Sequence, residues 1–256
     1  MKVAIYSRGV DTDQAQALNA LLNELYRHNI TICVFEELVN KFHLQAPSGQ
    51  HPLTTFTHCA ELTDLDCLIS VGGDGTVLDT ITMVGDSGIP ILGINYGRLG
   101  FLASISKDEL SIMVDALVNH TYVIDKRTLI HLDANLPLFN NSPFALNEFS
   151  IHKRDMSPMI KIHTYLNGEF LNSYWADGLI VATPTGSTGY SMSCNGPILF
   201  PDSASFLITP VAPHNLNVRP IVVPDTSIIS FEIEGRADEL ICAMDARKEI
   251  VPKNIN

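Results

Sequence analysis

Apolar runs and helical spacings alternate through the first half of the chain. Leu18, Leu21, Leu22 and Leu25 recur at the spacing that places side chains on one face of a helix. Further helices are predicted at residues 76–84 and 110–117. Apolar runs of strand length occupy residues 2–6, 30–35, 67–71 and 90–94. Strands that alternate with helices predict a parallel sheet with right-handed crossovers.

The second half of the chain changes to closely spaced strands with few helical patterns between them. The predicted strands are residues 122–132, 144–152, 159–166, 170–175, 179–182, 205–211, 221–223, 227–233 and 239–244. Asn167-Gly168 separates two of these runs and is typical of a tight hairpin. We therefore expect an α/β N-terminal domain at residues 1–122 and a β-rich sandwich domain at residues 123–256. Residues 45–57 predict a surface loop.

Charge narrows the possible partners. The chain has 256 residues, 46% hydrophobic and 17% charged, which argues for a folded globular protein. Its formal net charge is −12, so it is a poor candidate for non-specific nucleic-acid binding or for docking on an anionic membrane. A phosphate ligand would have to be met by backbone N–H groups, a few placed cations or a divalent metal.

The sequence also indicates the cellular compartment of the protein and whether it has a metal site of its own. No apolar run reaches about 18 residues, and residues 2–6 lack the length of a signal-peptide core, so neither a membrane span nor a leader is expected. The five cysteines contain no C-x-x-C pair and predict thiols in a reducing cytoplasm. The nine histidines show no metal-ligand spacing, so we expect no metal site formed by the protein alone.

A glycine-rich turn lies between a predicted strand and a predicted helix. It consists of Gly72, Gly73, Asp74, Gly75 and Thr76. Glycines allow the backbone to approach a ligand closely, and the start of the helix offers unpaired N–H groups, so the turn suits a phosphate. Asp74 would repel a phosphate unless it accepts a proton from a hydroxyl group or holds a metal. The alternative is an ordinary strand–turn–helix corner.

Three further segments are candidate binding elements. Residues 183–191 hold five Ser and Thr hydroxyl groups that can reach a polar ligand, and Tyr190 adds a ring on which a base or ribose can rest. An ordinary Ser/Thr-rich loop is the alternative. Residues 93–102 carry three glycines and Asn95 after a strand end, which is typical of a ligand loop or a domain hinge. Asn147-Glu148, inside a strand-like stretch, is a weak signal by itself.

Taken in order, these segments resemble the NAD kinase family. The family's G-G-D-G-T turn is at residues 72–76, its G-I-N-x-G-x-L-G-F-L segment at residues 93–102 and its N-E pair at residues 147–148. Its D-G-L-I-V-A-T-P-T-G-S-T-G-Y-S segment is at residues 177–191 and continues to Leu199. The match covers roughly residues 68–225, and the ordered set is far more specific than any single motif.

The resemblance implies a reaction and a set of site residues. It implies a nucleotide-binding first domain, a site in the cleft between the domains, and transfer of a phosphoryl group from ATP or polyphosphate to the adenosine-ribose 2′-hydroxyl of NAD. Asp74 would be the catalytic proton acceptor, and Mg²⁺ or another divalent cation would accompany ATP. Gly72, Gly73, Gly75 and Thr76 would form the phosphate loop. The implied NAD-binding residues are Asp74, Gly75, Asn147, Glu148, Asp177, Thr188, Gly189, Tyr190, Ser191, Met192 and Ser193. A homo-oligomer, dimer or tetramer, is implied as well.

Two departures from the family pattern leave alternatives open. Family members commonly carry a basic residue shortly after the glycine turn, whereas Leu78 and Asp79 follow it here, and they generally continue for some tens of residues beyond the position of Asn256. A catalytically silent NAD-binding regulator is therefore an alternative. A lipid or sphingoid kinase would predict an apolar groove, against which the 183–190 tract argues, and a 6-phosphofructokinase would alternate strands and helices throughout.

Overall fold

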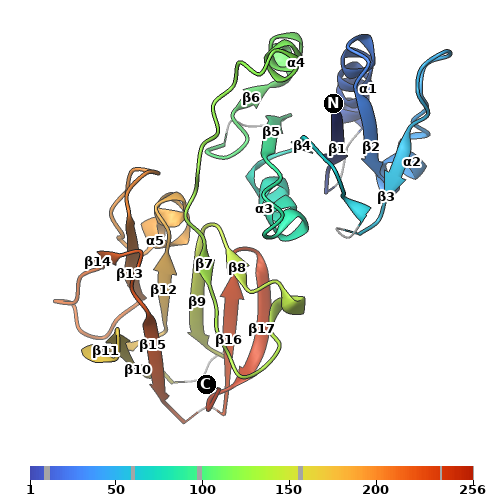
Figure 1. Cartoon of the computed structure of the whole chain (residues 1–256). Coiled ribbons are helices and arrows are strands. Elements are labelled where there is room, and N and C mark those ends of the chain that lie inside the picture. Colours follow the sequence, from blue (N-terminus) through green and yellow to red (C-terminus); the bar gives the residue numbers. More distant parts are fainter. Residues whose placement is uncertain (9–11, 59–60, 97–99, 155–157, 237, 256) are drawn as a thin grey trace. The chain divides into compact units, whose positions relative to one another are not determined.

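The fold consists of two compact units. The computed structural model describes residues 1–8, 12–58, 61–96, 100–154, 158–236 and 238–255. The units are residues 1–125 and 126–256, whereas the sequence places the domain boundary after residue 122 (Figure 1).

The first unit is a six-stranded parallel sheet with helices on both faces. The strand order is β3-β2-β1-β4-β5-β6. The strands are β1 (Lys2–Tyr6), β2 (Thr31–Phe35), β3 (Thr54–Phe56), β4 (Cys67–Val71), β5 (Ile91–Asn95) and β6 (Ile105–Ser106). The helices are α1 (Thr12–Arg27), α2 (Glu36–Phe42), α3 (Asp74–Val84) and α4 (Leu110–Val118), with a 3₁₀ turn at Lys107–Glu109. The chain runs outward from β1 to β3 and then resumes beside β1 at β4, so the sheet's topological switch point lies between β1 and β4.

Alternating residues of the central strands bury the two faces of this sheet. Val3 and Ile5 of β1 pack in one core with the leucine face of α1 and with Val114 of α4. Ala4 and Tyr6 face a second core, against which the end of α3 packs through Met83 and Val84. Because both faces are covered, the strands have the nearly continuous apolar sequences that the alternating pattern predicts.

The second unit is a β-sandwich of a six-stranded and a three-stranded antiparallel sheet (Figure 1). The large sheet has the order β14-β13-β12-β9-β16-β17 and the small sheet the order β11-β10-β15. Its strands are β7 (Ile130–His131), β8 (Phe144–Ala145), β9 (Glu148–Lys153), β10 (Ile160–Leu166), β11 (Glu169–Ala176), β12 (Gly178–Ala182), β13 (Ser205–Val211), β14 (Ile221–Pro224), β15 (Ile229–Glu234), β16 (Glu239–Met244) and β17 (Arg247–Pro252). Short helical turns lie at Phe139–Asn141, Thr185–Thr188 and α5 (Tyr190–Ser193). Ile162 and Tyr174 of the small sheet share one buried core with Leu179, Ile208 and Met244 of the large sheet.

The fold class predicted from the sequence is confirmed. Asn167 and Gly168 form the hairpin turn between β10 and β11, and both have positive φ angles, 53° and 84°. None of the described helices is long and apolar enough to cross a membrane.

Several element predictions were wrong in detail. The strand predicted over residues 122–132 is limited to Ile130–His131, because only these residues pair with another strand, β8. The strand predicted over residues 144–152 is broken between β8 and β9. Helix α3 starts at Asp74 rather than at Thr76, and part of the predicted loop at residues 45–57 is the edge strand β3. Helix α2 and strand β17 were missed.

Candidate active site

Asp74 is the first residue of helix α3, and backbone N–H groups hold its carboxylate. Leu102 and Ala103 donate to Oδ1 at 2.9 and 3.1 Å, and Phe101 donates to Oδ2 at 2.9 Å. These donors come from the segment between β5 and β6, which is adjacent to the end of β4 because β4 and β5 pair in parallel. The carboxylate is therefore fixed in orientation at the carboxyl edge of the sheet, where open α/β sheets bind ligands.

Gly100 makes this arrangement possible. A Cβ atom on Gly100 would lie 2.2 Å from Oδ1, 2.5 Å from Cγ and 2.7 Å from Oδ2 of Asp74. Gly93 of β5 has a related role, since its Cβ would lie 2.9 Å from the Cα of Ala103. The glycines of the predicted ligand loop thus let the backbone close around the carboxylate. Residues 97–99 of that loop lie outside the described residues.

The glycine turn enters helix α3 without a side-chain cap. Gly73 occupies the N-cap position, with no capping side chain, and Gly72 has a φ of 154°. A Cβ on Gly72 would lie 2.3 Å from Oγ1 of Thr76, so the turn also needs glycine for space. An uncapped helix start offers backbone N–H groups to an anion, as the sequence predicts for this phosphate loop.

In the second unit, Asn147 and Glu148 form a corner that two other segments hold in place. The Asp245 carboxylate, in the turn between β16 and β17, accepts hydrogen bonds from the N–H groups of Leu146, Asn147 and Glu148 at 3.0, 2.7 and 3.2 Å. The N–H of Thr183 donates to the carbonyl oxygen of Asn147 at 2.8 Å. These contacts explain why the predicted strand breaks between β8 and β9.

The start of the Ser/Thr-rich tract packs directly on this corner. A Cβ on Gly186 would lie 2.0 Å from the carbonyl oxygen of Asn147. A Cβ on Gly189 would lie 3.1 Å from Oε2 of Glu148. The tract and the N-E pair, 35 or more residues apart in the sequence, therefore belong to one site.

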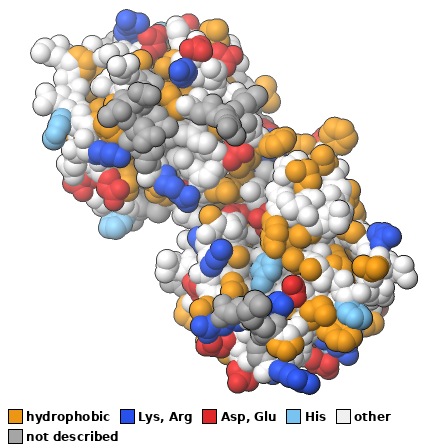
Figure 2. Space-filling model, turned by 180° about the vertical axis from the view of Figure 1, so that it is seen from behind, with side chains coloured by type: hydrophobic (Ala, Val, Ile, Leu, Met, Phe, Trp, Pro, Cys, Tyr) orange, Lys and Arg blue, Asp and Glu red, His pale blue; other side chains and the backbone are white. Residues whose placement is uncertain are grey.

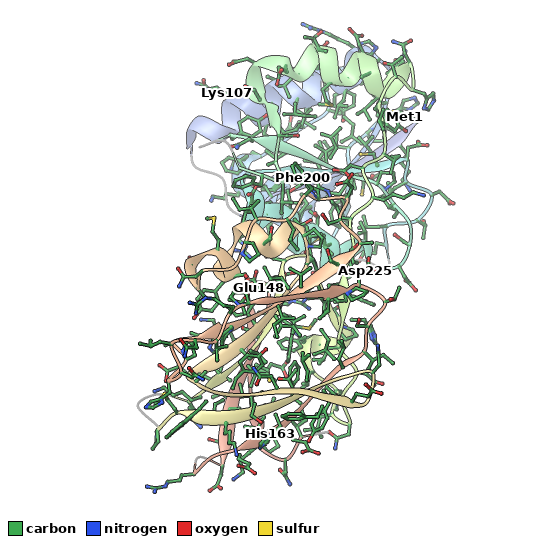
Figure 3. The ribbon with its side chains drawn as sticks, turned by 90° about the vertical axis from the view of Figure 1, so that its left-hand side faces the viewer. Met1, Lys107, Glu148, His163, Phe200 and Asp225 are labelled. Atoms are coloured by element: carbon green, nitrogen blue, oxygen red, sulfur yellow. The ribbon has the colours of Figure 1, made fainter. Side chains whose placement is uncertain are left out.

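Glu148 is a half-buried residue whose carboxyl group lacks full hydrogen bonding. Its Oε2 atom is buried and has no hydrogen-bond partner in the described structure. Burial, together with the nearby charge of Asp245, raises the pKa of Glu148 to about 7. The side chain lies beside helix α5 (Figure 3). An unpaired buried oxygen is costly, so this group is prepared for a ligand that can pair with it.

Three of the five Ser and Thr hydroxyl groups of the tract turn inward, although the sequence suggested that they can reach a polar ligand. Those of Thr183 and Ser187 bond to the backbone carbonyl groups of Leu146 and Pro184, and that of Ser191 pairs with Thr209 at 2.8 Å. These three hydroxyl-bearing residues are fully buried, because the tract must satisfy its own tight turns.

Other predicted residues of the tract remain accessible. Thr188 and Gly189 are half-buried, while Tyr190, Met192 and Ser193 are exposed. One face of the Tyr190 ring stacks on His152 at 5.7 Å between centroids. The contact with His152 therefore orients the Tyr190 ring from one side.

Asp177 is paired rather than isolated. Nζ of Lys153 lies 2.8 Å from Oδ1 of Asp177, and the backbone N–H of Lys153 donates to the Asp177 carbonyl at 2.9 Å. The side chain of Asp177 is 38% exposed, so a ligand can still reach it. The pairing offsets one negative charge in a strongly acidic chain.

Sequence reasoning missed two residues that hold the site together, Asp245 and Lys153, and did not find the role of a third, Gly100. Asp245 follows a recognisable strand, and its positive φ of 51° is typical of an aspartate in a turn, but nothing in the sequence connects it with residues 146–148. Lys153 gives no signal beyond its charge. Gly100 was noticed only as one of several loop glycines. In the described residues, no three His, Cys, Asp or Glu side chains are grouped to hold a metal.

The fold and these two sets of residues define a nucleotide-binding protein. One unit carries a glycine turn with an uncapped helix start and an oriented carboxylate at the carboxyl edge of its sheet. The other carries a polar corner with a buried, unpaired carboxyl oxygen beside an exposed aromatic ring.

Comparison with known proteins identifies the family. Residues 10–122 match the model of the ATP-NAD kinase N-terminal domain, and residues 146–254 match that of the ATP-NAD kinase C-terminal domain. The chain is 48% identical over 258 residues to an NAD kinase of Cytophaga hutchinsonii, covering 100% of this chain and 87% of that protein. It is 43% identical to an NAD kinase of Bacteroides fragilis, covering 97% of this chain and 85% of that protein. The chain belongs to the NAD kinase family, which is a family of phosphotransferases.

Solved structures agree with this assignment. The crystal structure of yeast NADH kinase complexed with NADH superposes with a TM-score of 0.83 at 25% identity, covering 97% of this chain and 76% of that one. The structure of an NAD kinase from Archaeoglobus fulgidus in complex with ATP has a TM-score of 0.75 at 27% identity, covering 98% and 86%. The sequence-based family prediction is confirmed.

Proposed function

We propose that this protein transfers a phosphoryl group from ATP to the 2′-hydroxyl group on the adenosine ribose of NAD, forming NADP. Family membership gives the reaction class. The observation that carries the proposal is the Asp74 carboxylate, held by three backbone N–H groups within the Gly72–Thr76 turn. A ribose hydroxyl is a poor nucleophile at neutral pH, and an oriented carboxylate supplies the proton acceptor that it needs.

The hydrogen bonds of Asp74 indicate which of its oxygens accepts the proton. An ionised carboxylate has about four acceptor positions, two on each oxygen. Oδ1 uses both for Leu102 and Ala103, whereas Oδ2 uses one for Phe101. Oδ2 is therefore the atom that we assign to the ribose hydroxyl. The backbone donors keep it in place, so the reacting group needs no reorientation.

The second unit supplies the binding of the dinucleotide in this proposal. The unpaired Oε2 of Glu148 would pair with a sugar hydroxyl group, and Asn147 would hold the adenosine portion beside it. Asp177, oriented by Lys153, would contact the nicotinamide end. The accessible residues Thr188, Gly189, Tyr190, Met192 and Ser193 would line the path of NAD, with the exposed face of Tyr190 as a stacking surface. Ser191, which is fully buried and bonded to Thr209, would support this segment from within.

The negative charges of the protein and of ATP call for a divalent cation bound to the phosphoryl donor. The chain carries a net charge of −12, and ATP adds further negative charge. Mg²⁺ bound to the ATP phosphates would enter as part of the substrate and neutralise that charge. In the predicted phosphate loop, the N–H groups of Gly73 and Gly75 would meet the phosphates. Those of Gly72 and Thr76 donate to the carbonyl groups of Ile94 and Gly73 at 2.9 and 3.0 Å, and shape the turn.

Formation of NADP from NAD and Mg-ATP tests the proposal directly. We expect NADP in a coupled dehydrogenase assay, with no product when NAD or ATP is omitted. The same assay with polyphosphate in place of ATP determines the donor range. Calorimetric binding of NAD without any NADP formation would instead identify the chain as a silent NAD-binding regulator and would overturn the proposal.

The proposal also covers the cellular compartment and the oligomeric state. We propose a cytoplasmic protein, supported by the free thiols of Cys33, Cys67, Cys194 and Cys242, while Cys59 lies outside the described residues. We also propose a homo-oligomer, dimer or tetramer. Figure 2 shows exposed hydrophobic side chains on the second unit, and Met192, Ile198 and Phe200 are 46%, 67% and 81% exposed. Such surfaces are typical of contacts between protein chains, and light scattering would measure the mass.

A further inference from the structure

Arg8 lies just beyond the end of strand β1, at the switch point of the first sheet. Strands β1 and β4 pair in parallel, with Tyr6 opposite Ser70, so the residues after β1 lie beside the glycine turn after β4. Ligands of doubly wound sheets bind outside the carboxyl ends of the strands at this point. Arg8 is therefore a cation placed where the fold itself favours a ligand.

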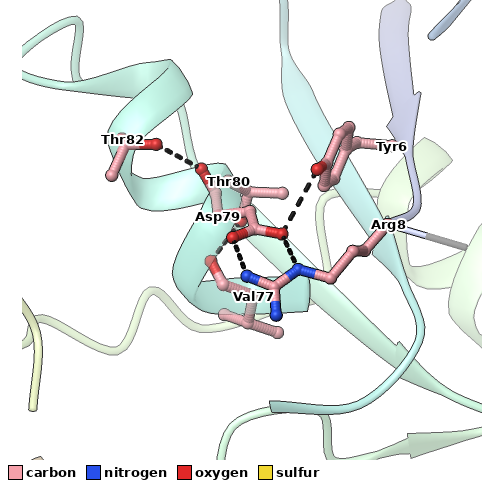
Figure 4. A network of polar contacts seen from close by, with 6 residues as sticks. All are labelled: Tyr6, Arg8, Val77, Asp79, Thr80 and Thr82. Atoms are coloured by element: carbon pink, nitrogen blue, oxygen red, sulfur yellow. Dashed lines mark hydrogen bonds and ion pairs between the residues drawn. The ribbon is translucent and has the colours of Figure 1, made fainter. Parts of the chain in front are cut away.

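Asp79 and Tyr6 hold this cation in position (Figure 4). Nε of Arg8 donates to Oδ2 of Asp79 at 2.6 Å, and Nη2 donates to Oδ1 of the same carboxylate. The Tyr6 hydroxyl donates to Oδ2 at 3.2 Å, and burial with the Asp79 charge raises the pKa of Tyr6 to about 12, which keeps this donor protonated. A bidentate pair of this kind fixes the plane of the guanidinium group.

The third nitrogen of the guanidinium group faces the glycine turn. Nη1 takes part in neither bond to Asp79, and Figure 4 shows it pointing away from that carboxylate. It lies 3.6 Å from the position that a Cβ on Gly75 would take. The side chain of Arg8 is 54% exposed, so solvent or a ligand can reach it.

Two other basic side chains of this unit, among the described residues, have partners away from the glycine turn. Lys2 donates to the carbonyl of Thr63 near the start of β1, and Arg27 pairs with Glu24 on helix α1. The glycine turn itself carries Asp74, and Asp79 lies one turn further along α3. A phosphate at the turn would meet two carboxylates, so a fixed cation beside Gly75 has a clear electrostatic purpose.

From this geometry we propose that Arg8 binds a phosphate group of the phosphoryl donor at the Gly72–Thr76 turn, through Nη1, while Asp79 and Tyr6 hold its other edge. The inference rests on the proposed function. It places part of the donor-binding site on Arg8, just after strand β1. Arg8 acts as a binding residue, and Asp79 acts as its positioning residue. The alternative is a plain ion pair that ties β1 to α3.

Steady-state kinetics with separate titration of ATP and NAD distinguish these roles. We expect Arg8→Ala to raise the KM for ATP about 10- to 100-fold, the range expected for loss of one charge-assisted hydrogen bond. The KM for NAD should stay within about twofold. Asp79→Asn should raise the KM for ATP by a smaller factor, because the guanidinium group loses its bidentate partner. Arg27→Ala removes an exposed ion pair of the same unit and should leave both KM values unchanged.

A second variant keeps the test decisive if Arg8→Ala does not fold. Arg8→Lys retains a charge that can pair with Asp79 but has no second edge for a phosphate, so its KM for ATP should still rise about tenfold. An unchanged KM for ATP in the folded variants, or a change in the KM for NAD alone, would overturn the inference.

Calorimetric titration with ATP separates this inference from the proposed function. The titration needs no turnover, so it remains informative if the parent chain forms no NADP. In that case the proposed function fails, whereas a weaker ATP affinity of Arg8→Lys would still support the phosphate contact. If the parent forms NADP and the variants bind ATP equally well, only the role of Arg8 is wrong.

Discussion

Replacing Gly100 by alanine tests whether the Asp74 carboxylate must keep its position. The added Cβ would lie 2.2 Å from Oδ1 and 2.5 Å from Cγ of Asp74, whereas such contacts in proteins are essentially never shorter than 3.0 Å. To admit the added methyl group, the carboxylate must move by nearly 1 Å. A misplacement of about 1 Å can cost about 10²-fold in rate. We expect kcat to fall by about that factor, with NAD binding retained.

A double-mutant cycle shows whether this loss passes through Asp74. In an Asp74→Ala background the atoms that the new Cβ would strike are absent, so Gly100→Ala should change kcat by less than about threefold. The assay is initial-rate NADP formation for the parent, both single variants and the double variant. Near-parental kcat in Gly100→Ala, or an equal loss in both backgrounds, would refute the reasoning.

Two predictions concern the corner in the second unit. The pKa of Glu148 is raised to about 7 from 4.5, so the folded state retains this proton longer than the unfolded state, and the protein should lose stability as pH rises through that window. Glu148→Gln should lose less stability than the parent between pH 5 and pH 8 in urea unfolding, and an equal pH dependence would contradict the assignment. Asp245→Ala leaves three backbone N–H groups without their acceptor, so its free energy of unfolding should fall by about 2 kcal/mol or more. Asp245→Asn, which keeps an acceptor, should lose less, and equal losses would argue against this role.

The sequence predicted the architecture well because hydrophobic spacing reports burial. The leucine face of α1 and the hairpin at Asn167-Gly168 were read correctly, since each is fixed by residues close in the chain. The run at residues 122–132 was misread because apolar residues there find no strand partner before Ile130: Val123 is 93% exposed.

The site could be predicted only where residues adjoin in the sequence. The glycine turn and the 183–191 tract were found as local motifs. Asp245 lies almost 100 residues along the chain from the N–H groups that donate hydrogen bonds to it, and Arg8 lies 71 residues from Asp79. Such pairs follow from strand order, which periodicity does not give. The inward direction of the Thr183 and Ser191 hydroxyl groups likewise depends on the packing of the tract on Leu146, just before β9, and on β13.

The central claim is that Asp74 accepts the proton of the ribose hydroxyl, and Asp74→Asn tests it most directly. Asparagine has nearly the same shape, and its carbonyl oxygen can still accept the bonds from Leu102 and Ala103. It cannot take up a proton at neutral pH, so we predict that kcat falls about 10²- to 10⁴-fold. The Kd for NAD should stay within about threefold, and added Mg²⁺ should not restore turnover. NADP formation at close to the parental rate in this variant would contradict the account.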